Sequence, residues 1–256
     1  MANYDIVGNI AIVKFKREER AATKKKFSLE FLEKTKNVTT ILEKSNKFSG
    51  RLRTQSTKYL AGDKTKEVLY KENGCVFRFN VDTCYFSPRL AAERREIAET
   101  VKRGEKVLVM FGGVAPFAIV IAKLSKAASV VSVELGRDCS KYALENVKKN
   151  KLINVEIVQG DVRKKLKGSK ERFDRIVMAR PNLKDSFLDV AFPIIKQGGI
   201  IHYYGFYPEI EKDKLLEMVK EEASKAKKKI KILNVKKAGE IGKKKYRFRV
   251  DLKILN

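Results

Sequence analysis

Three short apolar runs in the middle of the chain most constrain its fold. They span Val107–Phe111, Val130–Val133 and Val155–Val158. Each is short and rich in β-branched residues, which is typical of strands buried on both faces of a parallel sheet. A helical spacing of apolar residues over Ala118–Lys126 separates the first two runs. This alternation of strand and helix predicts an α/β fold with a parallel sheet.

Each run is followed by residues that suit a nucleoside ligand. Gly112 and Gly113 follow the first run, and glycines at a strand-to-helix turn let the backbone approach a ligand closely. Glu134 closes the second run about twenty residues later, where an acid can accept both hydroxyls of a ribose. Asp161 follows the third run, where it could accept from an adenine amino group. The pattern predicts a site for an adenosine-containing cofactor.

The glycine spacing distinguishes two such cofactors. A dinucleotide fingerprint needs three glycines as G-x-G-x-x-G to seat a pyrophosphate. The loop at 112–117 reads GGVAPF and lacks the third glycine. S-adenosylmethionine has no phosphate and is therefore the predicted cofactor, with an ordinary glycine-rich turn of an α/β domain as the alternative. The predicted cofactor contacts in this stretch are Phe111, Gly112, Gly113, Val114, Phe117, Glu134, Leu135, Asp161 and Val162.

The charge balance indicates the class of partner. The chain has 57 Lys and Arg against 31 Asp and Glu, a net charge of +26. Such an excess favours association with polyanions, and 43% hydrophobic residues still allow a proper core. Nucleic acid is the expected partner, and a general enrichment in lysine is the alternative.

Several other classes of protein are excluded or disfavoured. No apolar run approaches the ~18–20 residues of a membrane span, and the N-terminus does not read as a signal peptide. Cys75, Cys84 and Cys139 form no C-x-x-C pair and are expected to be reduced thiols of a cytoplasmic protein. His202 is the only histidine, so neither a histidine-based metal cluster nor a catalytic triad is expected.

The pattern of elements predicts two parts, a small α+β domain over residues 1–85 and a Rossmann-like domain over 86–256. The first part is expected to hold a strand pair or a bulged strand over Ile6–Phe15, a helix over Phe27–Lys36, a strand over Val38–Leu42, a basic loop-rich stretch over Arg51–Gly62, and a hairpin of Glu67–Tyr70 with Cys75–Val81.

The second part is expected to add three helices and three strands to the runs described above. The helices span Leu90–Arg103, Ser186–Lys196 and Lys212–Lys227, and the strands span Phe173–Met178, Ile200–Tyr204 and Tyr246–Ile254. Five or more strands alternating with helices imply a doubly wound sheet.

Several motifs together resemble a known family. The run KENGCVFRFNVDTCYFSPRLAAERREIAE, followed by MFGGVAPF, GDVR, DRIVM and GGIIHYY, is similar to the archaeal and eukaryotic tRNA guanine-N1 methyltransferases, which modify guanine 37 beside the anticodon. Their relatives in the wybutosine pathway transfer an aminocarboxypropyl group from the same cofactor. The resemblance extends from Ile6 to the end of the chain. It implies a Rossmann-like class I methyltransferase domain, S-adenosylmethionine as cofactor, the anticodon arm of tRNA as partner, a monomer, and the absence of the family's N-terminal domain that grips the tRNA elbow.

The resemblance also implies catalytic residues. Guanine N1 carries a proton and is a poor nucleophile until that proton leaves, so the reaction needs a base near N1 and a cation near O6. The family pattern places the base at Glu93 in S-P-R-x-x-x-E-R, with a solvated helix residue paired to a neighbouring cation as the alternative. It places the O6-binding cation at Arg53, seven residues before the leucine of LAG, in competition with Arg51. Arg89 of the SPR motif is expected to orient this segment, to touch the anticodon backbone or to join the cofactor site, and it favours methyl transfer over aminocarboxypropyl transfer.

Two departures from the family pattern leave alternatives open. Val109 stands where the family has an acid, and Ala115 stands where it has a glycine. Segment 179–181 reads Ala-Arg-Pro where the methyltransferases have Asn-Leu-Pro, so Asn182 is the candidate for base recognition, with capping of the next helix as the alternative. Pro181 joins the predicted cofactor contacts. Aminocarboxypropyl transfer, methylation of a tricyclic guanine derivative, and tRNA binding with weakened catalysis remain alternatives.

One further pair of residues belongs to the predicted core. Tyr203 and Tyr204 lie at the end of the predicted fifth strand of the second part. Both are expected to pack beside the sheet, and stacking on a base is the alternative. No functional role is therefore assigned to them from the sequence.

Overall fold

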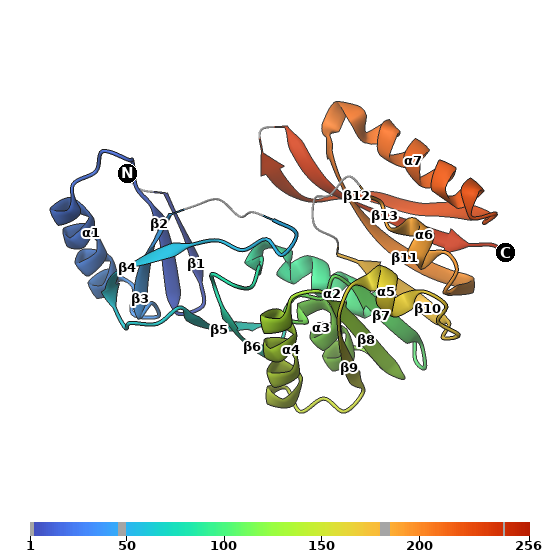
Figure 1. The fold of residues 1–256 in the computed structure, drawn as a ribbon, viewed down its shortest axis with the longest axis horizontal. Helices are drawn as coiled ribbons and strands as arrows, with labels where there is room; N and C mark the ends of the chain where they lie inside the picture. The colour runs from blue at the N-terminus through green and yellow to red at the C-terminus, as the bar shows by residue number, and fades with distance from the viewer. Residues whose placement is uncertain (1–2, 46–49, 180–184, 243) are drawn as a thin grey trace.

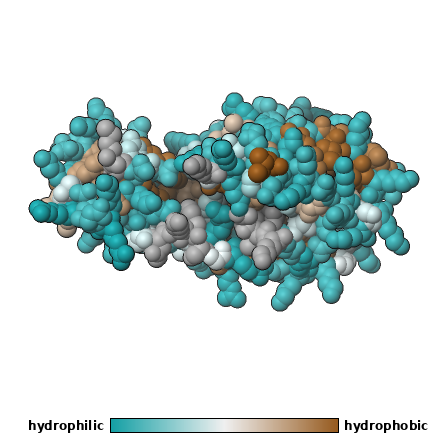
Figure 2. Space-filling view, turned by 90° about the horizontal axis from the view of Figure 1, so that it is seen from above, coloured by the Kyte–Doolittle hydropathy of each residue, from teal (hydrophilic) through white to brown (hydrophobic). Residues whose placement is uncertain are grey.

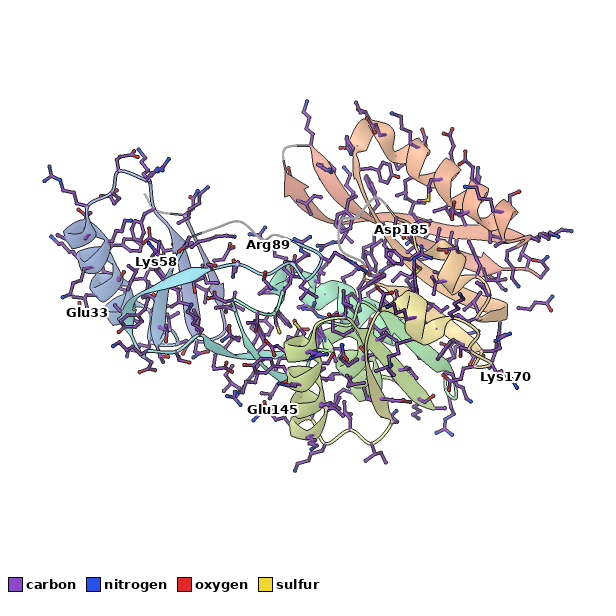
Figure 3. All side chains as sticks on the ribbon, in the orientation of Figure 1. Glu33, Lys58, Arg89, Glu145, Lys170 and Asp185 are labelled. Carbon is purple, nitrogen blue, oxygen red and sulfur yellow. The ribbon has the colours of Figure 1, made fainter. Side chains whose placement is uncertain are left out.

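The computed structural model describes residues 3–45, 50–179, 185–242 and 244–256. A small sheet module at the N-terminal end precedes a larger α/β part, and a hairpin lies between them (Figure 1). Among the described residues, no helix combines the length and the apolar character that crossing a bilayer requires. Hydrophilic side chains cover most of the face seen in Figure 2, and charged side chains project from both parts in Figure 3.

The N-terminal module is a four-stranded sheet with a helix on one face. Its elements are β1 (Asn3–Val7), β2 (Ile10–Lys14), α1 (Ala21–Lys34), β3 (Thr40–Lys44) and β4 (Thr57–Gly62), and the strands lie in that order. The antiparallel pairing of β1 with β2 confirms the predicted strand pair. Gly8 makes the turn with φ +59°, and a Cβ atom there would lie 2.1 Å from the carbonyl oxygen of Leu69. The turn therefore requires glycine both for its backbone angle and for its close approach.

Two predictions for this module were wrong in part. The stretch Arg51–Gly62, predicted as loop, contains β4, which pairs antiparallel with β3. The helix predicted over Phe27–Lys36 begins earlier, at Ala21, because the lysines that precede Phe27 are good helix formers although they carry no apolar pattern. In both places the pattern of apolar residues was too weak to show the element.

The predicted hairpin is present as β5 (Glu67–Glu72) and β6 (Cys75–Asn80). Asn73 and Gly74 connect the strands with φ angles of 50° and 70°. Two consecutive positive φ angles are what a type I′ turn requires, and Asn-Gly is its favoured sequence.

Two asparagines of a later helix attach this hairpin to the larger part of the molecule. Asn146 accepts from the backbone N–H of Arg78 (2.7 Å) and donates to its carbonyl (3.1 Å). Asn150 does the same for Val76, at 2.9 and 2.7 Å. The two side-chain amides thus form hydrogen bonds with the backbone N–H and carbonyl groups on the free edge of β6, as a further strand would do. A domain boundary at residue 85 stays a prediction.

The larger part is a seven-stranded sheet with the order β12-β13-β11-β10-β7-β8-β9. Strands β9, β8, β7, β10 and β11 are parallel, while β13 is antiparallel to both β11 and β12. The strands are β7 (Lys106–Met110), β8 (Ser129–Glu134), β9 (Val155–Gln159), β10 (Phe173–Met178), β11 (Ile195–Pro208), β12 (Ile230–Gly242) and β13 (Lys245–Ile254). This doubly wound arrangement confirms the predicted Rossmann-like fold.

Helices cover both faces of this sheet (Figure 1). They are α2 (Ala91–Thr100), α3 (Pro116–Leu124), α4 (Arg137–Lys149), α5 (Val162–Leu166), α6 (Leu188–Ala191) and α7 (Lys212–Lys225). Along β7, Val107 and Val109 pack in the core shared with α2, α3 and α4, whereas Leu108 and Met110 pack in the core shared with α5, α6 and α7. A strand with apolar residues toward both faces is the reason that the run at 107–111 shows no alternation.

The segment before β11 does not follow the prediction. Only Leu188–Ala191 forms a helix there, and Ile195 already pairs with Phe173 in the sheet. Gly198 and Gly199 therefore lie within β11, where the register with β10 shifts. The sequence predicted a helix over 186–196, but pairing with β10 extends the strand instead.

A row of buried polar side chains connects the neighbouring strands β10, β11 and β13. His202 Nε2 lies 2.7 Å from Arg175 Nη1, and Nδ1 lies 2.6 Å from Asp251 Oδ1. A guanidinium can only donate, so Nε2 is the acceptor and Nδ1 carries the proton that is donated to Asp251. Arg175 is paired in turn with Glu105, at 2.7 Å. His202 is therefore held neutral inside the protein.

The free energy of unfolding is expected to fall as the pH is lowered from 7 to 5. Burial lowers the pKa of His202 below 6.5, so the unfolded chain binds a proton that the folded chain does not. The loss begins near the ordinary histidine pKa and is at most about 1.4 kcal/mol per pH unit for one proton. Urea unfolding at a series of pH values measures it.

The variant His202→Gln is the control for this prediction. His202 is the only histidine of the chain, so no other side chain has its ordinary pKa in this window. The variant is expected to be less stable at pH 7 but to lose the slope between pH 7 and 5. An unchanged slope in the variant would assign the effect to other groups.

Candidate cofactor and catalytic site

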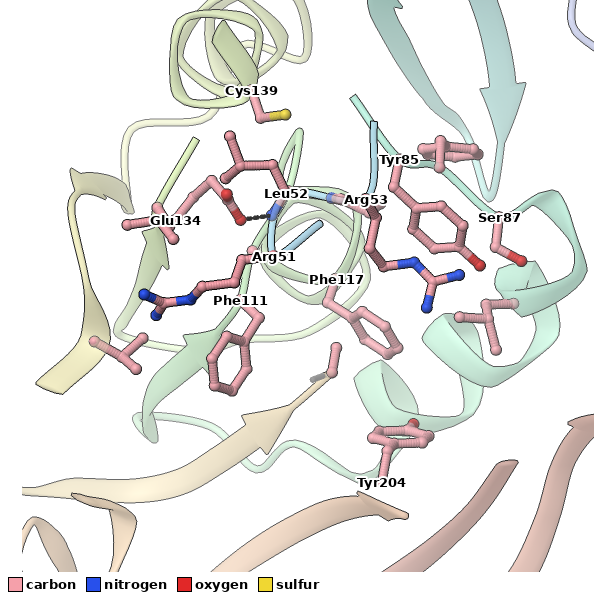
Figure 4. Close-up of a pocket in the computed structure, with 18 of the residues that line it drawn as sticks. Arg51, Leu52, Arg53, Tyr85, Ser87, Phe111, Phe117, Glu134, Cys139 and Tyr204 are labelled. Carbon is pink, nitrogen blue, oxygen red and sulfur yellow. Dashed lines mark hydrogen bonds between the residues drawn. The ribbon is translucent and has the colours of Figure 1, made fainter. Parts of the chain in front are cut away.

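A cavity lies at the carboxyl edge of β7, β8 and β10 (Figure 4). Its walls come from the loop at 51–53, the segment at 85–87, the turn after β7 and the ends of β8 and β9. Parallel strands present their carboxyl ends at one edge, where ligands of open α/β sheets bind. The predicted residues that line it are Arg53, Phe111, Gly112, Gly113, Phe117, Glu134, Leu135, Asp161 and Val162.

Glu134 joins the two loops that border the cavity. Its Oε2 accepts from the backbone N–H of Gly113 at 2.7 Å, and its Oε1 accepts from that of Gly136 at 2.6 Å. Burial raises the pKa of this carboxyl, and the two backbone donors oppose the shift. The carboxylate thereby fixes the glycine turn after β7 and still faces the cavity.

The glycine turn packs directly on β8. A Cβ atom on Gly112 would lie 2.0 Å from Ser132 Oγ, a distance that no real pair of atoms tolerates. Gly113 has φ +58°, and Ala115 adopts the left-handed conformation at φ +65° just before α3. A left-handed backbone is strained for a residue other than glycine, so Ala115 holds the start of α3 in a strained conformation.

Replacing Gly112 by alanine is expected to destabilise the protein by about 1–3 kcal/mol, the usual cost of overpacking a buried site. The added methyl group meets the buried hydroxyl of Ser132. Removing that hydroxyl in the double variant Gly112→Ala/Ser132→Ala is expected to restore most of the loss. Urea unfolding of the two variants checks this, and a double variant no better than Gly112→Ala would contradict the assigned contact.

Asp161 lies between β9 and α5. Its Oδ1 accepts from the backbone N–H of Arg163 at 2.9 Å, so it is the N-cap of the helix. Its Oδ2 accepts from Arg51 Nη2 at 2.8 Å. The hydrogen bond from Arg51 is the main cause that lowers the pKa of Asp161. A loop of the N-terminal module thus reaches the place predicted for adenine recognition.

Arg53 lies on the other side of the same loop and points into the cavity (Figure 4). Its guanidinium lies 4.3 Å from the centroid of the Tyr85 ring. Stacking on an aromatic ring holds the plane of a guanidinium in place. Both candidate arginines, Arg51 and Arg53, therefore border the cavity.

Glu93 lies in the first turn of α2, behind the cavity wall. Its side chain is only 6% exposed and does not line the cavity. Oε1 accepts from the Tyr204 hydroxyl at 2.9 Å and from Arg249. Oε2 lies 3.4 Å from Lys236 Nζ. The interpretation as a solvated helix residue is wrong.

The structure does not bring every predicted residue to the cavity. Val114 is fully buried and its carbonyl accepts from Asn146, so it stands behind the lining. Arg89 is exposed and pairs with Asp5 at 2.9 Å, outside the cavity (Figure 3). Pro181 and Asn182 lie outside the described residues.

Sequence reasoning missed several residues of this site. Tyr85, Arg247 and Tyr204 line the cavity. Tyr204 is buried, as expected from the sequence, but its hydroxyl is bonded to Glu93 rather than packed among apolar groups. Tyr85 lies two residues before Ser87, the first residue of the motif that contains Glu93, and this proximity was the one available signal. Arg247 lies on the last strand, and no motif marked it.

Comparisons of the sequence and of the structure with known proteins agree on one family. Residues 68–233 match the model of the TRM5/TYW2 methyltransferase domain. The tRNA (guanine(37)-N(1))-methyltransferase Trm5b of Pyrococcus abyssi is 36% identical over 98% of this chain and 74% of its own length. Its crystal structure superposes with a TM-score of 0.88 at 35% identity, over 99% of this chain and 75% of that one.

Two further relatives have different activities or ligands. The tRNA (guanine(37)-N(1))/4-demethylwyosine(37)-methyltransferase Taw22 of Nanoarchaeum equitans is 31% identical over 99% of this chain and 100% of its own length. The crystal structure of TYW2 from M. jannaschii in complex with AdoMet matches with a TM-score of 0.76 at 26% identity, over 99% of both chains.

Proposed function

Because the chain belongs to the TRM5/TYW2 methyltransferase family, we propose that it transfers the methyl group of S-adenosylmethionine to N1 of guanine 37 in tRNA. The observation that carries the proposal is the cavity where the glycine turn, Glu134 and Asp161 meet the loop of the N-terminal module that contains Arg51 and Arg53. The relative from P. abyssi, which aligns over nearly the whole chain, is named for this reaction.

The described residues fit the cofactor. Each oxygen of the Glu134 carboxylate accepts one backbone N–H and keeps a second lone pair, which a ribose hydroxyl could use. Asp161 remains partly exposed beside the cavity and could accept from an adenine amino group. Phe111 and Phe117 supply apolar walls. When bound, S-adenosylmethionine supplies a methyl group on a positively charged sulfur, which is an electrophile.

The chain's own residues would activate guanine. Arg53, stacked on Tyr85, would place its charge near O6, where negative charge develops as the N1 proton leaves. Glu93 would receive that proton as the general base. The net charge of +26 would hold the phosphate backbone of the anticodon arm, and the contacts from Lys and Arg would make tRNA affinity fall steeply with salt.

Methyl transfer to tRNA transcripts tests the function. Protein is incubated with cofactor labelled in the methyl group and with transcripts that carry guanine or adenine at position 37. Label in the first transcript alone, mapped to N1, supports the proposal. Label only from cofactor marked in its aminocarboxypropyl chain would assign the other transfer reaction, and tRNA binding without any transfer would assign a binding protein.

Methylation of 4-demethylwyosine at the same position is a second candidate. The Taw22 relative, which aligns over its entire length, is named for both guanine and 4-demethylwyosine. The same assay with tRNA that carries 4-demethylwyosine at position 37 decides whether this chain shares the second activity.

A further inference from the structure

Tyr204 connects Glu93 to the cavity. Tyr204 lies on β11, lines the cavity, and its ring is 6.1 Å from that of Phe117. Its hydroxyl donates to Glu93 Oε1 at 2.9 Å, whereas Glu93 itself does not line the cavity. Of these two residues, only Tyr204 is in a position to contact a base bound in the cavity, whose lining Figure 4 shows.

We infer that Tyr204 is a catalytic residue that passes the proton of guanine N1 to Glu93, with Arg249 as the residue that positions Glu93 for this transfer. The inference rests on the proposed methyl transfer. The N1–H bond breaks and its proton goes to Tyr204 Oη, while the hydroxyl proton of Tyr204 goes to Glu93 Oε1. The electron pair left on N1 forms the bond to the methyl group as the bond between that group and sulfur breaks. Tyr204 ends neutral and Glu93 ends protonated.

The two proton movements occur together because a free tyrosinate is unfavourable at this position. Burial first, and then the nearby Glu93 carboxylate, raises the pKa of Tyr204 well above its ordinary value of 10. A hydroxyl in this state does not give up its proton in advance. It can accept one proton only as it delivers the other along the existing hydrogen bond.

Arg249 on β13 fixes the acceptor oxygen. Its Nη1 donates to Glu93 Oε1, and its Nη2 donates to Glu96 Oε1 at 2.6 Å. Its Nε lies 2.9 Å from Asp251 Oδ1 without hydrogen-bond geometry, so that contact is electrostatic. Asp251 is held by His202, which is held by Arg175. The guanidinium is almost completely buried and cannot turn without breaking this row of contacts.

Glu93 belongs to a cluster of charged side chains. Among the described residues, two cations (Arg249 and Lys236) and three carboxylates (Glu93, Glu96 and Asp251) contact one another. The cluster therefore carries one net negative charge before the transfer, and the transferred proton cancels that charge.

Removing the Tyr204 hydroxyl tests the relay. Tyr204→Phe is expected to lower kcat for methyl transfer about 100-fold or more, the lower part of the range for general acid–base catalysis. The KM for tRNA and the calorimetric Kd for S-adenosylmethionine are expected to stay within about twofold, since shape is retained. Tyr203→Phe is the matched control, because Tyr203 is equally buried on the same strand but packs in the opposite core. Its kcat is expected to stay within about twofold of wild type.

A double variant distinguishes one proton path from two independent effects. The effects of groups that act in one step do not multiply. The kcat of the double variant Glu93→Gln/Tyr204→Phe is therefore expected to lie within a few-fold of the kcat of the slower single variant. If the losses in kcat of the two single variants multiply in the double variant, the relay is overturned. A Tyr204→Phe variant with the kcat of the wild type would also overturn the relay. In both cases the proposed function would stand as long as the wild type transfers methyl groups. Absence of methyl transfer in the wild type would instead overturn the proposed function.

Arg249→Lys tests the positioning role. Lysine keeps the charge but cannot bridge Glu93 and Glu96 with two separate nitrogens. The variant is expected to have a kcat between those of wild type and Tyr204→Phe, with unchanged KM for tRNA. A purely structural role would lower the melting temperature and leave kcat unchanged, and that result would remove Arg249 from the inference.

Discussion

Replacing Glu93 by glutamine is expected to lower the rate of methyl transfer by about 10²–10⁴-fold, the contribution of a positioned general base. Glutamine keeps the shape of the side chain, and its amide oxygen can still accept from the Tyr204 hydroxyl and from Arg249. It cannot, however, take up the proton that leaves guanine N1. Single-turnover transfer to a tRNA transcript measures the rate, and calorimetry measures cofactor affinity, which is expected to be unchanged.

Glu96→Gln is the matched control for that variant. Glu96 lies one turn further along α2 and pairs with the same two cations, Arg249 and Lys236, but its side chain is 41% exposed and makes no contact with Tyr204. The control removes the same charge from the same cluster without removing the base. Its rate is expected to stay within a few-fold of wild type. Equal losses in the two variants would mean that the cluster acts through its total charge, and that Glu93 is not the base.

The part of the cavity around the glycine turn and Glu134 was predictable from the sequence because its determinants are local. A buried strand, a glycine turn and an acid at the end of the next strand follow one another within a short stretch. The pairing of β7 with β8 then brings Gly113 and Glu134 into hydrogen-bond contact. The Asn73-Gly74 hairpin was predictable for the same reason, since its turn conformation depends on only two residues.

The contacts of Glu93 were not predictable in the same way. Tyr204 and Arg249 are 111 and 156 residues from Glu93 in the sequence. Their contacts depend on the antiparallel pairing of β13 with β11, where Tyr204 is opposite Arg249, and on the packing of α2 against that edge. No local pattern around Glu93 distinguishes a buried carboxylate with these partners from an exposed one. The family resemblance identified the residue, and the tertiary structure identified its partners.

Replacing Glu134 by alanine is expected to weaken the binding of S-adenosylmethionine by about 10- to 100-fold. Hydrogen bonds to a charged group contribute about 1.5–3 kcal/mol, and about 1.4 kcal/mol corresponds to a factor of ten. Two effects add: the ribose loses its acceptor, and the N–H groups of Gly113 and Gly136 lose the carboxylate that holds both loops. Calorimetric titration of the cofactor measures the change, and tRNA affinity in the absence of cofactor is expected to be unaffected.

Two further variants separate these effects from a general loss of negative charge. Asp138→Asn removes an acid at the start of α4, close in sequence but outside the cavity, and is expected to bind the cofactor as wild type does. Glu134→Gln keeps one acceptor oxygen for one of the two backbone donors and is expected to be intermediate. Unchanged affinity in Glu134→Ala would mean that the ribose does not lie at the end of β8.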